Sequence, residues 1–350
     1  MQKTVFSCRS RRAFLATCGS ASLSMISLQA KAPARGGPTF PVKKTGQVLL
    51  PRGPAGSFDS THAKYPCVLK VGDEWWMWYN GRSNDSFTGA VGLATSLDGL
   101  KWTKSNDGKP VLDHGGPAAA DETKVDHPAV LFFDERFHMW YTAGPRSSNY
   151  QICYATSEDG TDWQRQNGGR PVLGPGAAGQ FDARVVLHPA VVRDESGLLH
   201  LWYNGVGPQP DFHVGHATSM NGITWKRENG GAPVLSAAPS PLRPEAYVYN
   251  VNVLREAGIY RMWYSSAQKL LASGQYAPGG SAIVYAESED GTRWKRDPVN
   301  TLVSGEVGSE DAYACFAPHV VRRERELWMY YSMGSVYQRY QVGLAISAAE

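Results

Sequence analysis

Short apolar runs, separated by turns rich in Gly, Asp and Asn, recur along the chain from about residue 57. One unit, residues 126 to 176, contains DHPAVLFFDERFHMWYTAG, then YQICYATSEDGTDW, then RPVLGPG. Apolar runs of this length bounded by turn residues are typical of β-strands joined by hairpins. Each unit therefore predicts four short strands: an inner strand at a Pro, a second ending in Trp-Tyr, a third ending in Ala-Thr-Ser or Ala-Glu-Ser, and an outer strand at Pro-Val-Leu.

One phrase marks every full unit: SLDGLKW (96–102), SEDGTDW (157–163), SMNGITW (219–225) and SEDGTRW (288–294). Its tryptophans are 61, 62 and 69 residues apart. We interpret the phrase as the turn between the third and fourth strands, in which Asp or Asn and Gly supply the turn geometry and Trp packs the outer strand against its neighbour. Because it recurs in every unit, we expect it to be structural.

A fifth unit begins near residue 309 and lacks an outer strand at its end. A matching strand stands at the other end of the chain, where QVLLPRGPAGSFD (47–59) parallels PVLGPGAAGQFD (171–182). The sequence therefore predicts an all-β fold, a single five-bladed β-propeller of four-stranded antiparallel blades, in which the N-terminal strand completes the last blade and closes the ring. The expected blades are about 57–113, 119–174, 180–236, 244–304, and 309–349 with 45–51.

Residues 1–32 read as an export signal, with basic residues first, an apolar stretch over 13–28, and a small-residue cleavage site at 30–32. Within it SRRAFL (10–15) resembles the twin-arginine signal. A transit peptide, rich in Ser and Arg and free of acidic residues, is the alternative. We expect the twin-arginine translocase to export the domain 33–350 to the periplasm or the medium, or to the thylakoid lumen in a cyanobacterium or plastid. No later segment is apolar enough to span a membrane, so no membrane association is expected after signal removal.

Charge and cysteine content exclude several classes of function. Without residues 1–32 the chain has 30 basic and 32 acidic residues, so nothing suggests a nucleic-acid partner. Cys67, Cys153 and Cys315 match no metal motif; they are expected to be buried thiols, with a Cys67–Cys315 disulfide as the alternative. No nucleotide, flavin or nucleophile-elbow motif is present, so no organic cofactor is expected.

The recurring pattern HPAV, MWY, ATSxDGxxW, PVL is similar to the five-bladed propellers of glycoside hydrolase families 32, 43, 62, 117 and 130. The phrase is also similar to the Asp-box of sialidase-type propellers, although it is one residue shorter. The resemblance implies a sugar bound at the axis, where inner strands converge. Resemblance to family 43 implies a catalytic Asp directly before the inner-strand Pro of blade one and a catalytic Glu near that of blade three. Here Tyr65 stands at the first place and His188 at the second. Only Asp126 lies near a family position.

Two histidines at equivalent axial places are further catalytic candidates, because imidazole titrates near neutral pH. His127 and His188 precede the inner-strand prolines, and family 117, in which a His is thought to be the acid, resembles this arrangement. A structural role is the alternative. An axial metal ion on His127, His188 and Asp126 is conceivable, but no ligand spacing supports it, and we expect none. His319 follows Pro318 and is expected to point away from the axis.

A second series of acidic residues lies before the inner-strand prolines: Asp59, Asp121, Asp182 and Asp311, with Glu245 near the matching place. Their recurrence favours a turn or cap role. The alternative is a catalytic pair, with Asp59 and Asp182 as first candidates, because inversion needs two carboxyl groups ~6.5–9.5 Å apart.

Blade four departs most from the repeat, and a departure is where a single site is expected. Its PEAYVYNVNV stretch brings Glu245, Tyr247, Tyr249 and Asn250 near the axis, and with Tyr65 they are the predicted substrate-binding residues. Tyr rings stack on pyranose faces, although an inner-strand Tyr is as often core. The insertions 206–214 and 267–281 could wall the same funnel.

The sequence therefore predicts an exported glycoside hydrolase that acts on an oligo- or polysaccharide in the axial funnel, with inversion as one route. Catalysis would depend on Asp59, Asp126 or Asp182, assisted by His127 or His188. One alternative is a non-catalytic carbohydrate-binding or interaction propeller. A second is a glycoside phosphorylase, which needs a cationic phosphate pocket, for which the nearest candidates are Arg184 and Arg243.

Overall fold

The computed structural model describes residues 43–83, 88–145, 149–238, 245–267, 280–297, 302–336 and 339–347. The chain divides into the compact units Met1–Thr39 and Phe40–Glu350, and all that follows concerns the second. The predicted signal, residues 1–32, lies outside the described residues, as does most of the insertion 267–281. No helix in the described ranges is long and apolar enough to cross a membrane.

The regular structure of this unit is almost entirely β, as predicted. Its strands are β1 (Lys43–Leu50); β2 (His62–Val71), β3 (Glu74–Arg82), β4 (Ala90–Ser96), β5 (Thr103–Lys104); β6 (Lys124–Phe133), β7 (Arg136–Gly144), β8 (Gln151–Ser157), β9 (Gln164–Arg165); β10 (Val185–Arg193), β11 (Leu199–Val206), β12 (Phe212–Ser219), β13 (Lys226–Arg227), β14 (Leu235–Ser236); β15 (Tyr247–Glu256), β16 (Ile259–Ala267), β17 (Ser281–Ser288), β18 (Lys295–Arg296), β19 (Leu302–Val303); β20 (Ala314–Arg323), β21 (Glu326–Val336) and β22 (Arg339–Ile346).

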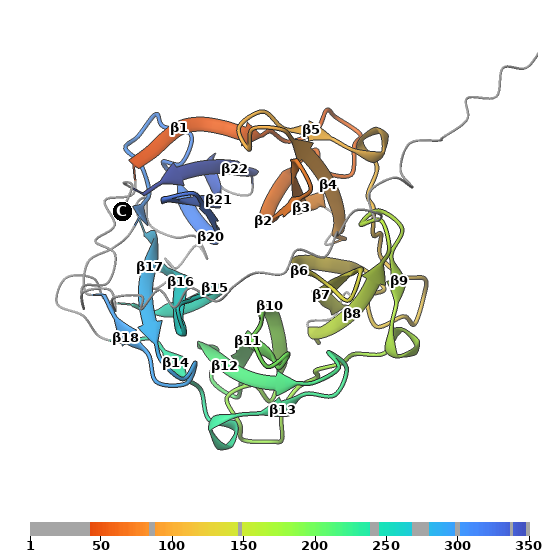
Figure 1. Ribbon diagram of the computed structural model, residues 1–350, viewed down its shortest axis with the longest axis vertical. Helices are drawn as coiled ribbons and strands as arrows, with labels where there is room; N and C mark the ends of the chain where they lie inside the picture. The colour runs from red at the N-terminus through yellow and green to blue at the C-terminus, as the bar shows by residue number, and fades with distance from the viewer. Residues whose placement is uncertain are drawn as a thin grey trace, which may run out of the picture. The chain divides into compact units, whose positions relative to one another are not determined.

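Neighbouring strands pair antiparallel in chain order within each group, such as β6-β7-β8-β9 and β10-β11-β12-β13. The first strands of the groups contact one another in a closed cycle, β2 to β6 to β10 to β15 to β20 and back to β2. They lie nearest the centre of the ribbon diagram (Figure 1). The inner ends of the sheets therefore converge, which places side chains from distant parts of the chain around one axis.

The predicted outer strand is formed in two short pieces. In the third group β13 and β14 both pair with β12, and the 3-10 turn η3 (Asn229–Gly231) separates them. The same turn recurs as η1 (Asn106–Gly108) and η2 (Asn167–Gly169), and each contains residues with positive φ. The strand at Pro-Val-Leu is therefore present, but a left-handed turn interrupts its pairing.

Strand β1 pairs antiparallel with β22, with register partners from Lys43↔Ile346 to Leu50↔Val342. Figure 1 shows β1 running along the outer side of this last group. The parallel register pair His62↔Tyr340 joins β22 to β2. A strand from the start of the described chain thus occupies the outer place beside its last strand.

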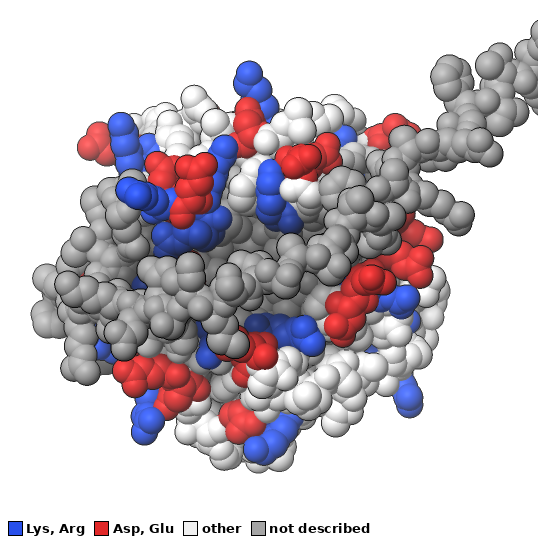
Figure 2. Space-filling view, in the orientation of Figure 1, with Lys and Arg blue, Asp and Glu red and all other residues white. Residues whose placement is uncertain are grey.

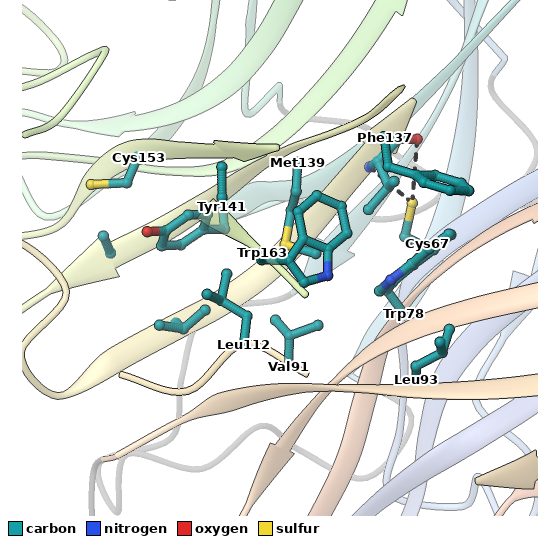
Figure 3. Close-up of a cluster of buried hydrophobic side chains, with 14 residues drawn as sticks. Cys67, Trp78, Val91, Leu93, Leu112, Phe137, Met139, Tyr141, Cys153 and Trp163 are labelled. Carbon is teal, nitrogen blue, oxygen red and sulfur yellow. Dashed lines mark hydrogen bonds between the residues drawn. The ribbon is translucent and has the colours of Figure 1, made fainter. Parts of the chain in front are cut away.

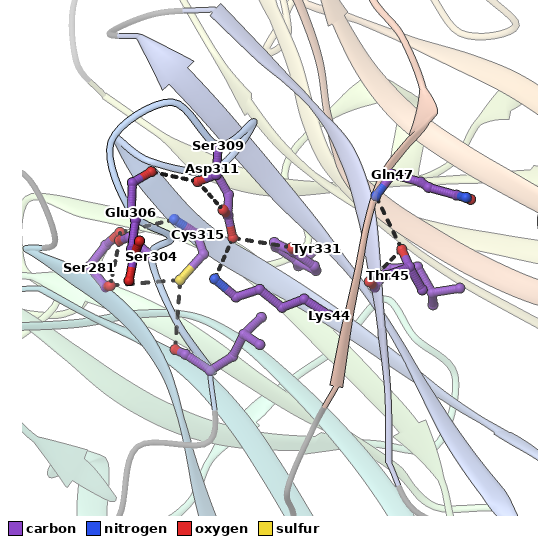
Figure 4. A network of polar contacts seen from close by, with 12 residues as sticks. Lys44, Thr45, Gln47, Ser281, Ser304, Glu306, Ser309, Asp311, Cys315 and Tyr331 are labelled. Atoms are coloured by element: carbon purple, nitrogen blue, oxygen red, sulfur yellow. Dashed lines mark hydrogen bonds and ion pairs between the residues drawn. The ribbon is translucent and has the colours of Figure 1, made fainter.

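A buried acid, a tyrosine and a cation form the same contact in every group. The tyrosine hydroxyl donates to the acid at 2.9–3.3 Å, and the cation lies 2.6–3.7 Å away. The sets are Asp59, Tyr79, Lys104; Asp121, Tyr141, Arg165; Asp182, Tyr203, Arg227; Glu245, Tyr264, Arg296; and Asp311, Tyr331, Lys44. The cation comes from the outermost strand, and for Asp311 that strand is β1 (Figure 4).

The repeated phrase ties each group to its neighbour, which confirms its structural role. Trp78 on β3 donates its indole N–H to the Gly160 carbonyl at 3.0 Å, and its ring meets Trp163 edge to face at 6.3 Å. Both rings lie in one apolar cluster with Met139 (Figure 3). Gly160 has a φ of +74°, and a Cβ there would lie 2.7 Å from the Trp76 ring. A glycine is therefore required where the turn meets the neighbouring sheet.

Cys67, Cys153 and Cys315 are buried and form no disulfide with one another. The alternative of a Cys67–Cys315 disulfide is therefore wrong, and the expectation of buried thiols is confirmed. Burial raises the pKa of the Cys67 and Cys153 thiols to about 12, which makes both unreactive near neutral pH.

Lys44→Met should lower the free energy of unfolding by about 1–3 kcal/mol, because Asp311 would remain a buried carboxylate without its cation. Urea denaturation measures this change. Lys43→Met, at the exposed neighbouring position of the same strand, is the control and should change stability by less than about 0.5 kcal/mol. Equal effects of the two substitutions would mean that the Lys44–Asp311 pair contributes nothing to stability.

Candidate functional site

Each inner strand is interrupted by one residue in the left-handed region of the backbone. These residues are Tyr65, His127, His188, Asn250 and Ala317, with φ between 48° and 56°. At each of them the pairing with the second strand shifts register, which is the signature of a β-bulge. A bulge redirects side chains, and left-handed backbone is costly for Tyr and His, so the surrounding contacts must hold it.

At four of the five bulges a side chain of a second strand accepts the N–H of the left-handed residue. Thr142 accepts from His188 at 2.8 Å, and Asn204 accepts from Asn250 at 2.9 Å. Ser265 and Ser332 do the same for the inner strands β20 and β2. Each acceptor directly follows the buried Tyr that ends the aromatic pair of its strand. This recurring polar position is the signal in the sequence from which the contacts could have been predicted.

Four predicted site residues from different groups meet at the bulges. The rings of Tyr65 and His127 stack with centroids 3.2 Å apart, and His127 and His188 are 3.8 Å apart. Asn250 Oδ1 lies 2.6 Å from His127 Nε2. The structure thus brings together residues that are as many as 185 positions apart in the sequence.

Asp126 is the carboxylate next to this stack. Its Oδ1 accepts the His127 backbone N–H at 3.0 Å and lies 3.6 Å from His127 Nδ1, and its side chain is 14% exposed. Burial alone would raise the pKa of Asp126, but bonding to His127 and the positive charges of Lys64 and Lys124 hold it below its usual range. Asp126 is therefore ionised near neutral pH and partly open to solvent.

Lys64 is a member of the site that was not predicted from the sequence. It is only 7% exposed, and its Nζ bonds the Tyr65 hydroxyl at 3.1 Å. Burial lowers the pKa of Lys64 to about 8, with Asp126 opposing the shift and Arg82 and Lys124 adding to it. No sequence pattern indicated Lys64, because Asp126 and Lys124, whose charges act on it, lie on another inner strand.

Aromatic side chains extend from the stack. Phe212, in the insertion 206–214, lies parallel to His188 at 6.3 Å and contacts Tyr247 and Tyr249 at 6.0 and 6.1 Å. Tyr247 and Tyr249, predicted to bind substrate, are thus connected to the axial residues through a ring that was not among the predicted site residues. Flat apolar surfaces of this kind suit the faces of sugar rings.

The remaining predicted acids lie elsewhere. Asp59 and Asp182 are 1% and 0% exposed and are held by Tyr and Lys or Arg in the sets described above. Glu245 bonds Tyr264 and lies 3.7 Å from Arg296. These contacts favour the structural role that recurrence had suggested. A catalytic role for Asp59 or Asp182, and a substrate-binding role for Glu245, stay predictions.

A cavity of about 580 Å³ follows the inner strands along the axis. Tyr65, His127 and Asn250 line it, and so does His319. The expectation that the His319 side chain points away from the axis stays a prediction, because every residue from Ala317 to Arg322 lines the cavity. His319 bonds the Val68 carbonyl at 3.0 Å and so bridges two inner strands.

Burial lowers the pKa of both His127 and His188, for His188 well below its usual value. Both rings are therefore neutral near pH 7 and suit hydrogen bonding or proton acceptance better than proton donation. Within the described ranges no group of three or more His, Cys, Asp or Glu side chains could hold a metal ion.

Acidic and basic side chains are mixed on the described part of the face shown in Figure 2. No single-sign patch of the kind that binds nucleic acid covers the described residues of this face.

Comparison with known proteins gives relatives but no family profile: no protein-family model matches the chain. An uncharacterized protein of Mycobacterium tuberculosis strain H37Rv is 25% identical over 318 residues, 87% of this chain and 98% of the relative. A 1,2-beta-oligomannan phosphorylase of a Thermoanaerobacter species (strain X514) is 28% identical over 138 residues, 37% of this chain and 45% of that protein.

Solved structures of similar fold cover most of the chain. One is described by the words that the GH130 family of mannoside phosphorylases contains glycoside hydrolases that target β-1,2 mannosidic linkages. Its TM-score is 0.69 at 16% sequence identity, and the match covers 89% of this chain and 96% of that one. A thermostable family-43 glycoside hydrolase has a TM-score of 0.62 at 17% identity, covering 85% and 91%. The expected resemblance to glycoside hydrolase propellers is thus confirmed at the level of fold.

His188→Gln should make stability less sensitive to acid. A folded-state pKa below the unfolded value means that the unfolded chain binds the proton more readily, so stability falls as pH drops below about 6.5. Removing His188 should reduce the slope of the free energy of unfolding against pH by up to about 1.4 kcal/mol per pH unit. Urea denaturation between pH 4.5 and 7.5 tests this, and an unchanged slope would show that folding does not disfavour protonation of His188.

Proposed function

We propose that the protein is a carbohydrate-active enzyme that cleaves glycosidic bonds at the axis of its sheets. The observation that carries the proposal is an ionised, partly open carboxylate, Asp126, beside stacked polar rings where strands of different groups converge. The fold similarity and the phosphorylase relative give the chemical class. Titratable groups that lie close together and have shifted pKa values are a usual mark of an active site.

The arrangement of the sheets is a further part of the proposal. We infer a five-bladed propeller over 33–350 in which β1 completes the last blade. The cycle of inner-strand contacts and the Lys44–Asp311 pair support it, because Lys44 takes the place that an outer-strand cation takes in each other group. Such closure leaves no open sheet edge beside β22.

In the hydrolytic form of the proposal, Asp126 accepts a proton from water as the water oxygen attacks the anomeric carbon. The bond from that carbon to the leaving oxygen breaks, and the oxygen takes the proton of the Tyr65 hydroxyl. Lys64, protonated below about pH 8 and 3.1 Å away, returns a proton to Tyr65. Tyr247, Tyr249 and Phe212 would bind sugar rings.

Phosphorolysis is the second candidate, and the cationic surroundings of Asp126 favour it. Lys64, Lys124 and Arg82 act electrostatically on one another or on Asp126, and this group of cations fits an oxyanion. Of the two arginines predicted from the sequence, Arg184 is exposed and Arg243 lies outside the described residues. Phosphate brings its own nucleophile, so a single carboxylate would suffice. A bound oxyanion would also raise the pKa of Asp126 and let it act as an acid. The phosphorylase relative makes β-1,2-mannosides the first substrates to test.

The place of action is part of the proposal. Residues 1–32 would direct export through the twin-arginine translocase, and the domain 33–350 would act in the periplasm or outside the cell. The support is the sequence SRRAFL followed by an apolar stretch and a small-residue cleavage site.

Asp126→Asn should lower kcat on the cleaved glycoside by about 10²–10⁴-fold with the fold intact, because the amide cannot accept the proton. Asp182→Asn is the comparison variant: it should lower stability by breaking the contact with Arg227, while the folded fraction keeps its activity. A reducing-sugar assay on β-mannosides, with and without phosphate, and circular dichroism measure the two effects.

The outcomes separate the alternatives. If folded Asp182→Asn is inactive and Asp126→Asn is still active, the catalytic carboxylate is not Asp126. The role would then belong to the pair Asp59 and Asp182 that the sequence analysis considered. Glycan binding without any product from the unsubstituted protein would favour a non-catalytic propeller. Product that requires phosphate would establish phosphorolysis.

Lys64 should set the alkaline limit of activity. Its pKa of about 8 means that the charge is present below that pH and is lost as pH rises through it, so kcat/KM should fall above pH 8. Lys64→Arg should keep oxyanion binding and remove this alkaline fall, at some cost in proton transfer. Lys64→Met should lose both oxyanion binding and proton transfer. A pH–rate profile with an unmoved alkaline limb in Lys64→Arg would assign the limit to another group.

A further inference from the structure

The hydrogen bonds around Asn204 determine which way its amide points. Its Nδ2 donates to the carbonyls of Val248 at 2.9 Å and His213 at 3.2 Å, and its Oδ1 accepts the backbone N–H of Asn250 at 2.9 Å. These three partners agree on one orientation, since a flipped amide would face two carbonyl oxygens with an oxygen. The oxygen of this fully buried amide is therefore fixed toward the axis.

The same oxygen lies 3.1 Å from Nδ1 of His188. An amide oxygen cannot donate, so a hydrogen bond at this distance requires that His188 Nδ1 carries the hydrogen. A neutral imidazole has only one N–H, which leaves Nε2 with its lone pair. Among the described residues no hydrogen bond to His188 Nε2 is formed.

The ring of His188 cannot easily turn away from this arrangement. His127 lies on one side with ring centroids 3.8 Å apart, and Phe212 lies parallel at 6.3 Å. The backbone N–H of His188 is bound by Thr142, which fixes the bulge from which the ring projects. Asn204 thus holds both the ring of His188 and, through the Asn250 N–H, the neighbouring bulge.

We propose that Asn204 is a positioning residue that holds His188 as the Nδ1–H tautomer, so that Nε2 accepts a hydrogen bond from a hydroxyl group of the substrate at the axis. This use of Nε2 rests on the proposed function; the tautomer itself does not. A site that accepts from one hydroxyl selects sugars that carry it, because the analogue without the hydroxyl leaves a buried acceptor unpaired.

The first test is the imidazole ¹⁵N spectrum of the histidine-labelled protein at pH 7, assigned with His188→Gln. Protonated and bare ring nitrogens have clearly separated ¹⁵N shifts, so the expected result is a protonated Nδ1 and a bare Nε2. A protonated Nε2, or protonation of both nitrogens, would overturn the proposal. This readout needs no substrate and therefore stands even if the proposed function fails.

Variants then test the part played by Asn204. Asn204→Leu should mix the two tautomers and raise KM at least about tenfold with a smaller change in kcat, as for a lost positioning contact. Ser265→Ala is the matched control: it removes the equivalent bond to the Ala317 N–H and should leave the His188 spectrum and KM unchanged.

The variants also keep the two proposals distinguishable. A folded Asn204→Leu protein with the tautomer of the unsubstituted chain would overturn the role of Asn204. The expected tautomer together with no turnover on any glycoside would contradict the proposed function alone. If Asn204→Leu does not fold, the spectrum of the unsubstituted protein decides.

Discussion

The site depends on one backbone constraint, the left-handed residue that interrupts each inner strand. At Tyr65, His127, His188 and Asn250 this conformation directs a ring or an amide toward the axis. Bulky residues rarely adopt a positive φ, so the strain must be offset by contacts with a neighbouring group, such as the bond that the His188 N–H donates to Thr142 on β7. Because the bulge recurs with different side chains, one repeated scaffold can present a different chemical group at each place around the axis.

The same repetition explains what could be predicted. Hairpin turns, the Trp contacts and the buried acids all return with a fixed spacing, so strands and turns follow from local pattern. Recurrence also favoured a structural role for Asp59 and Asp182, and the Tyr and cation partners of both explain why. In the first three groups the outer strand differed from expectation because left-handed turns at η1, η2 and η3 divide it.

The site could be predicted only in part, because its partners meet across groups. His127, His188 and Asn250 were found since they stand at equivalent places before inner strands. Lys64 and Asn204 were missed, because each has its role through residues of other strands. The charges of Asp126 and Lys124 on β6 act on Lys64, and Asn204 bonds residues of β10 and β15. A bulge also breaks the alternation of side chains along a strand, so spacing alone does not tell which residues of β20 face the axis.

Burial affects the protonation states of the titratable groups in the site differently. It keeps His127 and His188 neutral, whereas hydrogen bonding and nearby cations keep Asp126 ionised. Lys64 remains charged at neutral pH but close to losing its proton. A neutral acceptor, a carboxylate and a lysine ready to release a proton thus lie around one axis, and their separate protonation states arise from environment rather than from residue type. That separation is what a reaction requiring simultaneous proton uptake and release needs.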